Sequence, residues 1–261
     1  MAKTNTIQDF ERLHLYYQKR AYTSLIKDFR RILKGIPYDN LSYELSDKVI
    51  ALNINDAIIK GTLKNVYVEV GLKYGKHVVR DLQSETKALK PFPLFSERFI
   101  KFVTDYLLKY GGIKITSITE TLAKSVLSVI REAQEAGLSQ SKMINLVRDK
   151  VNKPNFYRWQ AMRIARTESL FAMNSAKVES FESNSFKVNK VWRQGGSRHP
   201  RADHSIMDGT EVPSEQPFTL PNGERAMFPG DSSLSASQVI NCSCSIGYKP
   251  VRDNNGNLVM K

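Results

Sequence analysis

Residues 240–248 read Ile-Asn-Cys-Ser-Cys-Ser-Ile-Gly-Tyr, and their apolar or cysteine side chains alternate strictly with polar residues or glycine. A period of two residues is typical of a β-strand with one buried face. This segment closes a longer stretch that begins at Trp192 and holds half of the four histidines, both cysteines and one of the two tryptophans. We therefore expect the stretch from Trp192 to Tyr248 to organise the fold and to hold any chemistry that the chain performs.

Most of the chain before this stretch has the pattern of amphipathic helices. Apolar residues recur at steps of three and four over residues 1–34, 46–84, 95–110, 117–136, 139–147 and 155–181. Gly111-Gly112 is expected to end the amino-terminal helical half. Ser117-Ile118-Thr119-Glu120 has the form of a capping box, in which the first and last side chains satisfy backbone donors at a helix start, so a new helix is expected there.

The period changes from helix to strand after Asn184. Phe186, Val188 and Trp192 fall on one side of an alternating segment, and Lys190 is the exception on that side. Further along, Pro221-Asn222-Gly223 predicts a turn whose flanks pair as a hairpin.

These patterns predict an α+β protein. A mainly helical amino-terminal half is followed by a compact domain of helices packed on a small, mostly antiparallel sheet with long loops. We expect a helical docking domain over residues 1–112 and the compact domain over residues 113–248. Residues 249–261, with Asp253-Asn254-Asn255-Gly256-Asn257, are expected to form a flexible tail.

The net charge of the chain indicates which classes of partner it attracts. Its 261 residues carry 39 Lys and Arg against 26 Asp and Glu, a net charge of +13. Such an excess predicts attraction to DNA, RNA or an acidic protein surface, although many basic proteins bind no anion specifically. No apolar run is long enough for a membrane span, and the first residues lack the apolar core of a signal peptide, so a cytoplasmic origin is expected.

The histidines and cysteines of the organising stretch suggest a zinc site as one interpretation. His199, His204, Cys242 and Cys244 are residue types that bind zinc. On a straight strand, however, the two sulfurs would lie about 7 Å apart, too far for one zinc ion without a bend. The alternative is that both cysteines are small core residues of a buried strand, since free cysteine packs well. We expect the core interpretation and no cofactor, and zinc bound by His204, Cys242 and Cys244 remains the alternative.

An acid–base or metal-dependent nuclease centre is the second interpretation of this stretch. Its candidates are Glu168, His199, His204, Asp208 and Asp231. No zinc-protease, nucleophile-elbow, phosphate-loop or dinucleotide-loop motif accompanies them. We therefore expect no catalytic residue and no enzyme, and we expect these polar groups to tie loops together through charge-assisted hydrogen bonds.

A series of short motifs in a fixed order carries a family resemblance. The motifs are Arg163-Ile164-Ala165-Arg166-Thr167-Glu168 with Asn174, Val191-Trp192, Arg201-x-x-His204-x-x-x-Asp208-Gly209, Phe218, Pro229-Gly230-Asp231 and Asn241-Cys242-Ser243-Cys244. Over roughly residues 118–248, the chain resembles the phage head morphogenesis family of Mu F-like minor head proteins. The family's usual Asn-Cys-Arg-Cys has Ser243 at its third position here.

The resemblance implies that residues 113–248 are a Mu F-like minor head domain. The motif residues would then be structural: Arg166, Glu168, Asn174, Trp192, Arg201, His204, Asp208, Gly209, Asp231, Cys242 and Cys244. The implied role is that of a non-enzymatic minor structural protein of a tailed-phage head, associated with the portal vertex and acting in head assembly and in DNA packaging or ejection. In the wider family the domain is also fused to toxins.

The resemblance also implies the partners and the location. The main partner would be the phage portal protein, with major capsid or scaffold proteins, other copies of the chain, and packaged DNA touched through non-specific backbone contacts as further candidates; no membrane is involved. The protein would be found in the host cytoplasm before assembly and then in the virion head. The alternative is an enzyme-like or nucleic-acid-processing protein that is carried in the head and delivered with the DNA.

Overall fold

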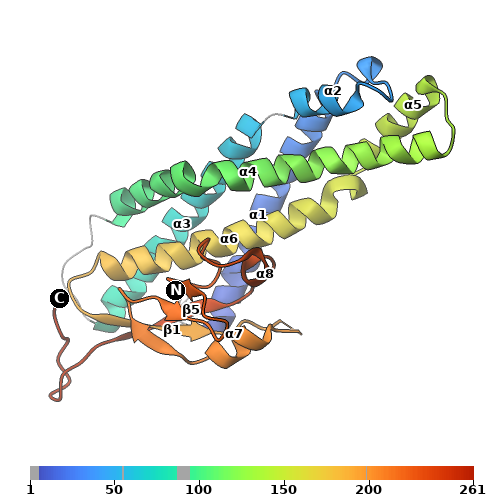
Figure 1. The fold of residues 1–261 in the computed structure, drawn as a ribbon. Coiled ribbons are helices and arrows are strands. Elements are labelled where there is room, and N and C mark those ends of the chain that lie inside the picture. The colour runs from blue at the N-terminus through green and yellow to red at the C-terminus, as the bar shows by residue number, and fades with distance from the viewer. Residues whose placement is uncertain (1–5, 55, 87–94, 198) are drawn as a thin grey trace. The chain divides into compact units, whose positions relative to one another are not determined.

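The computed structural model describes residues 6–54, 56–86, 95–197 and 199–261, and its elements follow one another as Figure 1 shows. The helices are α1 (Ile7–Lys34), a short 3-10 helix (Tyr38–Asn40), α2 (Ser46–Asn53), α3 (Asp56–Thr86), α4 (Phe95–Glu135), α5 (Gln140–Val151), α6 (Asn155–Glu182), α7 (Ala202–Met207) and α8 (Ala236–Val239). The strands are β1 (Val188–Arg193), β2 (Glu211–Pro213), β3 (Phe218–Thr219), β4 (Arg225–Ala226) and β5 (Ser245–Pro250). The predicted α+β class, helical first and then helices with a small antiparallel sheet, is confirmed.

The chain forms two compact units, each built from segments that are distant in sequence. The first, here called the sheet unit, contains residues 1–20, 65–105 and 163–261. The second, here called the helical unit, contains residues 21–64 and 106–162. The predicted boundary between residues 112 and 113 falls inside α4, so each unit combines residues from both predicted domains.

The predicted helix end at Gly111-Gly112 is wrong, because both glycines lie inside α4. The helix continues through both glycines to Glu135, so Ser117 lies in its interior and starts no new helix. Glycine costs a helix about 1 kcal/mol relative to alanine, whereas burial of apolar side chains on a long helix contributes several times that amount. Phe99 and Leu122, on either side of the glycines, are both completely buried, which explains why the helix persists.

The helical unit has an aromatic and aliphatic core with polar contacts at its margin. The rings of Phe29 and Tyr157 meet edge to face with centroids 6.1 Å apart, and both side chains are buried. The Tyr43 hydroxyl donates a hydrogen bond of 2.8 Å to the carbonyl of Leu138, at the turn between α4 and α5. Contacts of this kind between remote segments hold the unit together.

The sheet unit contains a three-stranded antiparallel sheet in the order β2-β1-β5. Trp192 of β1 pairs with Ile246 of β5, which sets the register of the central pair. β3 and β4 form a separate hairpin, as Pro221-Asn222-Gly223 predicts, and Gly223 takes the left-handed conformation with φ 86°. Glycine adopts this conformation without steric cost, which explains its place in the turn.

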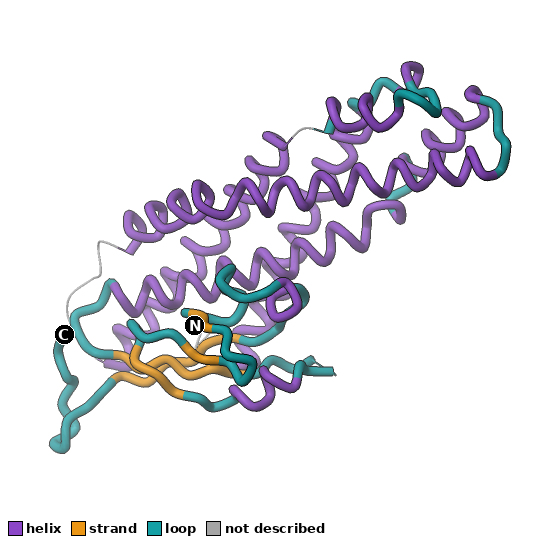
Figure 2. The backbone as a smooth tube through the Cα atoms, in the orientation of Figure 1, coloured by secondary structure: helices purple, strands orange, loops and turns teal. Residues whose placement is uncertain are grey.

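The carboxyl-terminal part of α6 lies along the sheet within this unit, as Figure 2 shows. Asn174 donates hydrogen bonds from its Nδ2 to the carbonyls of Pro229 (2.9 Å) and Cys244 (3.0 Å). Two turns further on, Phe181 packs against Tyr248 of β5 with ring centroids 5.6 Å apart. Helix α6 therefore fixes where the segment that enters β5 lies.

The last residues form a hydrogen-bonded hairpin where the sequence predicts a flexible tail. The N–H of Lys187 donates to the carbonyl of Val259 (2.8 Å), and the N–H of Val251 donates to the carbonyl of Lys187 (2.9 Å). The Asp253 carboxylate accepts hydrogen bonds from the backbone N–H groups of Asn255 and Asn257 and so closes the turn. The Asp- and Asn-rich composition reflects turn formation here.

Among the described helices, none combines the length and the apolar character that crossing a membrane requires.

Candidate functional site

Cys242 and Cys244 lie in the loop before β5, and the predicted strand over residues 240–248 is wrong in its first half. α8 ends at Val239, and β5 begins only at Ser245. Between them, Asn241 takes a positive φ of 58°, alone among the described non-glycine residues. Asparagine tolerates this left-handed conformation better than most residues, and the turn it makes ends the alternation that a straight strand would need.

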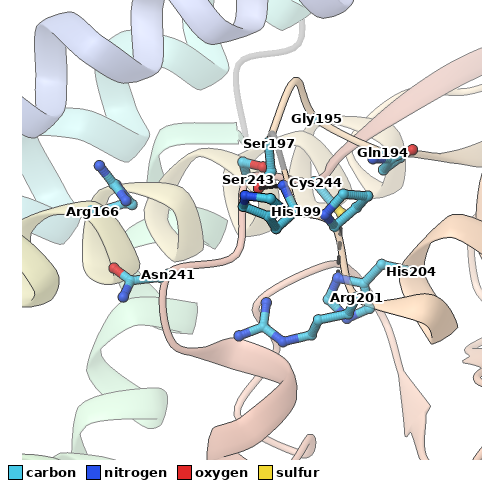
Figure 3. A pocket seen from close by; sticks show the side chains of 11 residues that line it. Arg166, Gln194, Gly195, Ser197, His199, Arg201, His204, Asn241, Ser243 and Cys244 are labelled. Atoms are coloured by element: carbon cyan, nitrogen blue, oxygen red, sulfur yellow. Dashed lines mark hydrogen bonds between the residues drawn. The ribbon is translucent and has the colours of Figure 1, made fainter.

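The turn brings the two sulfurs together with His204. Nδ1 of His204 lies 3.6 Å from Sγ of Cys242 and 3.4 Å from Sγ of Cys244. Figure 3 shows the contact between His204 and Cys244. The three possible ligand atoms all lie within 4.8 Å of one another, and all three residues are buried. The predicted separation of about 7 Å, which rested on a straight strand, therefore does not apply.

Helix α7 and the sheet fix the orientation of His204. The imidazole packs edge to face against Trp192, with centroids 5.3 Å apart, and Trp192 packs in the same way against Phe218 at 5.3 Å. Nε2 of His204 is buried, and the described residues offer it no hydrogen-bond partner. A buried polar atom without a partner costs about 1–3 kcal/mol, so this arrangement does not maximise stability by itself.

The pKa values of the two thiols are shifted in opposite directions. The hydrogen bond from the Cys242 thiol lowers the pKa of Cys244, and the neighbouring His204 acts in the same direction. The same hydrogen bond and burial raise the pKa of Cys242 well above its ordinary value. Cys244 is therefore the sulfur that more readily carries negative charge.

A pocket of about 320 Å³ opens beside this cluster. Its walls are Arg166, Gln194, Gly195, Ser197, His199, Pro200, Arg201, His204, Asn241, Ser243 and Cys244, most of which Figure 3 labels. Arg201 is held in place by hydrogen bonds from its guanidinium to the carbonyls of Ser237 and Ile240. With Arg166 and Arg201 on its walls, the pocket presents positive charge next to the sulfurs.

His199 is the sequence candidate that the structure leaves outside the cluster. It lines the same pocket as His204 and Cys244, but it is not part of the group whose ligand atoms lie within 4.8 Å of one another. Its backbone N–H donates a local hydrogen bond to the hydroxyl of Ser197.

The acidic motif residues lie elsewhere and bind neighbouring groups of the chain. Glu168 is buried on α6 and accepts a hydrogen bond from the hydroxyl of Tyr67. Asp208 accepts from the N–H of Gln194 at 2.8 Å, and Asp231 accepts from the N–H groups of Met227 and Ser233. Such bonds between a carboxylate and backbone N–H groups hold loops in place.

Gly209 completes the turn that follows α7. It has φ 80°, and its N–H donates a hydrogen bond of 2.9 Å to the carbonyl of Trp192. A residue with a side chain is strained at this φ, which explains why the Asp208-Gly209 pair ends the motif that begins at Arg201.

Two buried lysines of the sheet unit, Lys177 and Lys190, were not among the predicted site residues. Nζ of Lys177 donates to the carbonyl of Ile246 at 2.6 Å, and burial lowers its pKa to about 7. Nζ of Lys190 donates to the carbonyl of Met227 at 2.8 Å, and burial lowers its pKa to about 8. Lys190 was detectable in the sequence because it occupies an inward position of the alternating segment around β1.

Comparisons with known proteins agree with the motif order. Residues 124–247 match the family described as "Phage Mu protein F like protein", which confirms the resemblance found over roughly residues 118–248. "Uncharacterized protein YqbB" of Bacillus subtilis (strain 168) is 32% identical over 167 residues, which cover 63% of this chain and 52% of YqbB. "NAD(+)--arginine ADP-ribosyltransferase EFV" of Enterococcus faecalis (strain ATCC 700802 / V583) is 24% identical over 211 residues, which cover 78% of this chain and 42% of EFV.

The chain thus spans about half the length of these curated relatives, 52% of the one and 42% of the other. No solved structure matches the chain.

Proposed function

Because residues 124–247 match the family described as "Phage Mu protein F like protein", we propose that this chain is a non-enzymatic minor structural protein of a tailed-phage head. The family match is the observation that carries the proposal. In this role the protein joins the head during assembly, lies near the portal vertex, and acts in DNA packaging or ejection.

The interior of the sheet unit supports a structural role for the motif residues. Asn174 is completely buried and bonds two separate loops, through the carbonyls of Pro229 and Cys244. Trp192 is completely buried as well and packs between His204 and Phe218. A set of residues that joins α6, β1, α7 and the loop before β5 is what a stable assembly component needs.

Exposed basic side chains on α1 support an anionic partner. Lys27, Arg30, Arg31 and Lys34 are all exposed within the helical unit, on the second half of this helix. We propose that they contact an acidic face of the portal protein. DNA backbone would be contacted by the same charges, and either contact weakens steeply as the salt concentration rises.

The proposed role is tested by deleting the gene from the phage or prophage that encodes it. We expect fewer filled heads and fewer infectious particles, restored when the intact gene is supplied in trans. Lys27→Glu with Arg31→Glu should restore less than the intact gene, whereas Lys142→Glu with Lys153→Glu, an equal charge change elsewhere in the helical unit, should restore fully. Normal yields of filled, infectious heads without the gene would contradict the role.

The match to EFV raises the question of an enzyme, since that protein is named as an arginine ADP-ribosyltransferase. This chain spans only 42% of EFV and also matches the Mu F-like family. We propose that the transferase activity belongs to the part of EFV that this chain does not span. Incubation of the purified chain with labelled NAD+ and arginine-containing protein should transfer no label; transfer above a heat-treated control would contradict this.

A further inference from the structure

We propose that Nδ1 of His204 and the sulfurs of Cys242 and Cys244 bind one zinc ion, with the fourth coordination position open to the adjoining pocket. The proposal goes beyond the role in the phage head, which requires no metal. It rests on the geometry, burial and surroundings of these three side chains.

The two nitrogen–sulfur distances fit a tetrahedral zinc site. Zinc binds sulfur at about 2.3 Å and imidazole nitrogen at about 2.0–2.1 Å, so a nitrogen and a sulfur on one tetrahedron lie about 3.5 Å apart. The two such distances here, from Nδ1 of His204 to the sulfurs of Cys242 and Cys244, are 3.6 and 3.4 Å. The donors therefore need little movement to share an ion.

The chemistry of the donors also fits zinc. Two thiolates and a neutral imidazole balance the double positive charge of the ion, so the cluster becomes neutral on binding. His204, Cys242 and Cys244 are 2%, 1% and 3% exposed, and charges at such depth need compensation. Hard cations such as Ca²⁺ and Mg²⁺ prefer oxygen donors, and the cluster contains none.

A backbone N–H group and a closely packed glycine loop adjoin the sulfurs. The N–H of Cys244 points to Sγ of Cys242 with N···S 3.4 Å. Gly195 approaches so closely that a Cβ on it would lie 2.1 Å from the carbonyl oxygen of Ser243. Only glycine lets the two loops pack this closely beside the cysteines.

The pocket leaves the fourth coordination position of the ion to a water molecule. Cys244 and His204 line the pocket of about 320 Å³, which has room for water beside the ion. His199 lines the same pocket but lies outside the cluster of donor atoms, so we assign it no bond to the metal. A zinc ion here would join α7 to the loop before β5.

Metal analysis of the full chain tests the proposal. The protein is produced in zinc-supplemented medium and purified under reducing conditions without chelator, and we expect about one zinc per chain by inductively coupled plasma mass spectrometry. Metal-free protein treated with Co²⁺ should show thiolate-to-cobalt charge-transfer absorption in the near ultraviolet. Cys242→Ser, Cys244→Ser and His204→Gln should each reduce the zinc content at least tenfold, whereas His199→Ala, in the same pocket, should keep it.

Folding is separated from binding by starting from the wild-type chain. Zinc is removed with a chelator, retained secondary structure is verified by circular dichroism, and stoichiometric rebinding is measured against a chromophoric competitor. Rebinding of one ion supports the site. Less than one zinc per ten chains together with no cobalt–thiolate spectrum from the reduced protein would overturn it, as would an intact mass 2 Da lower that shows a Cys242–Cys244 disulfide in freshly purified protein.

Discussion

Replacing the buried Lys177 by methionine should remove a large part of the pH dependence of stability between pH 7.5 and 9.5. Lys177 is 1% exposed, and its ammonium group lies 5.3 Å from the ring centroid of Phe10 and donates to the carbonyl of Ile246. Burial, with a smaller contribution from the nearby Arg193, lowers its pKa from 10.5 to about 7. The charged form is thus disfavoured in the folded state.

The sign and size of the effect follow from proton linkage. Between pH 7 and 10.5 the unfolded chain holds a proton at Lys177 that the folded chain has released, so the free energy of unfolding rises with pH. The slope reaches about 1.4 kcal/mol per pH unit, and integration from pH 7.5 to 9.5 gives about 2.5 kcal/mol. In Lys177→Met this contribution is lost, whereas the missing hydrogen bond to Ile246 shifts the stability equally at each pH.

Urea unfolding at pH 7.5, 8.5 and 9.5 measures the difference. Trp192 is completely buried in the sheet unit and reports its unfolding, and Trp159→Phe removes the 83% exposed tryptophan of the helical unit from the signal. Lys190, whose pKa is lowered to about 8, leaves a residual slope of the same sign in every variant. Lys142→Met, at an exposed site, is the control and should keep the wild-type slope. Equal slopes for Lys177→Met and the wild type would refute the reasoning.

Three further predictions concern the sheet unit. Gly195→Ala places a methyl group 2.1 Å from the carbonyl oxygen of Ser243. It should lower the melting temperature by several degrees and weaken metal binding. In the control, Gly196→Ala, the added methyl group meets only the side chain of Glu11, and neither effect is expected. Asn174→Ala leaves two buried carbonyls without their donor and should cost about 2–4 kcal/mol in urea unfolding; a loss below 1 kcal/mol would contradict this. Burial lowers the pKa of His14 from 6.5 to about 4, so the unfolded state binds a proton first and stability should fall as pH drops from 6.5 to 4, by up to about 3 kcal/mol. His14→Gln should flatten that acid limb, and an unchanged limb would count against the assignment.

The sequence predicted the parts of the fold that depend on local periodicity. The alternation of Val188 and Trp192 identified β1, and Pro221-Asn222-Gly223 identified the β3–β4 hairpin, because the residues that decide these elements are neighbours in the chain. The helix end predicted at Gly111-Gly112 is wrong because burial of apolar side chains along α4 outweighs the low helix propensity of glycine. No local sequence pattern reports this tertiary burial.

The candidate site was predictable in its residue types and not in its geometry. His204 and the two cysteines were identified as possible ligands, but they are separated by 38 and 40 residues, and their meeting depends on the turn at Asn241. The strict alternation around Cys242 indicated a strand and concealed this turn. Alternation of side chains describes burial, and a loop with two buried cysteines on either side of Ser243 produces the same pattern over three residues.

The most direct test of the proposed role in the phage head is quantitative mass spectrometry of gradient-purified heads, with cryo-electron microscopy of the portal vertex on the same particles. The proposed role predicts a fixed ratio of this chain to the portal protein, and density at that vertex which disappears when the gene is deleted. Heads that contain the portal protein and packaged DNA but no copies of this chain would contradict it.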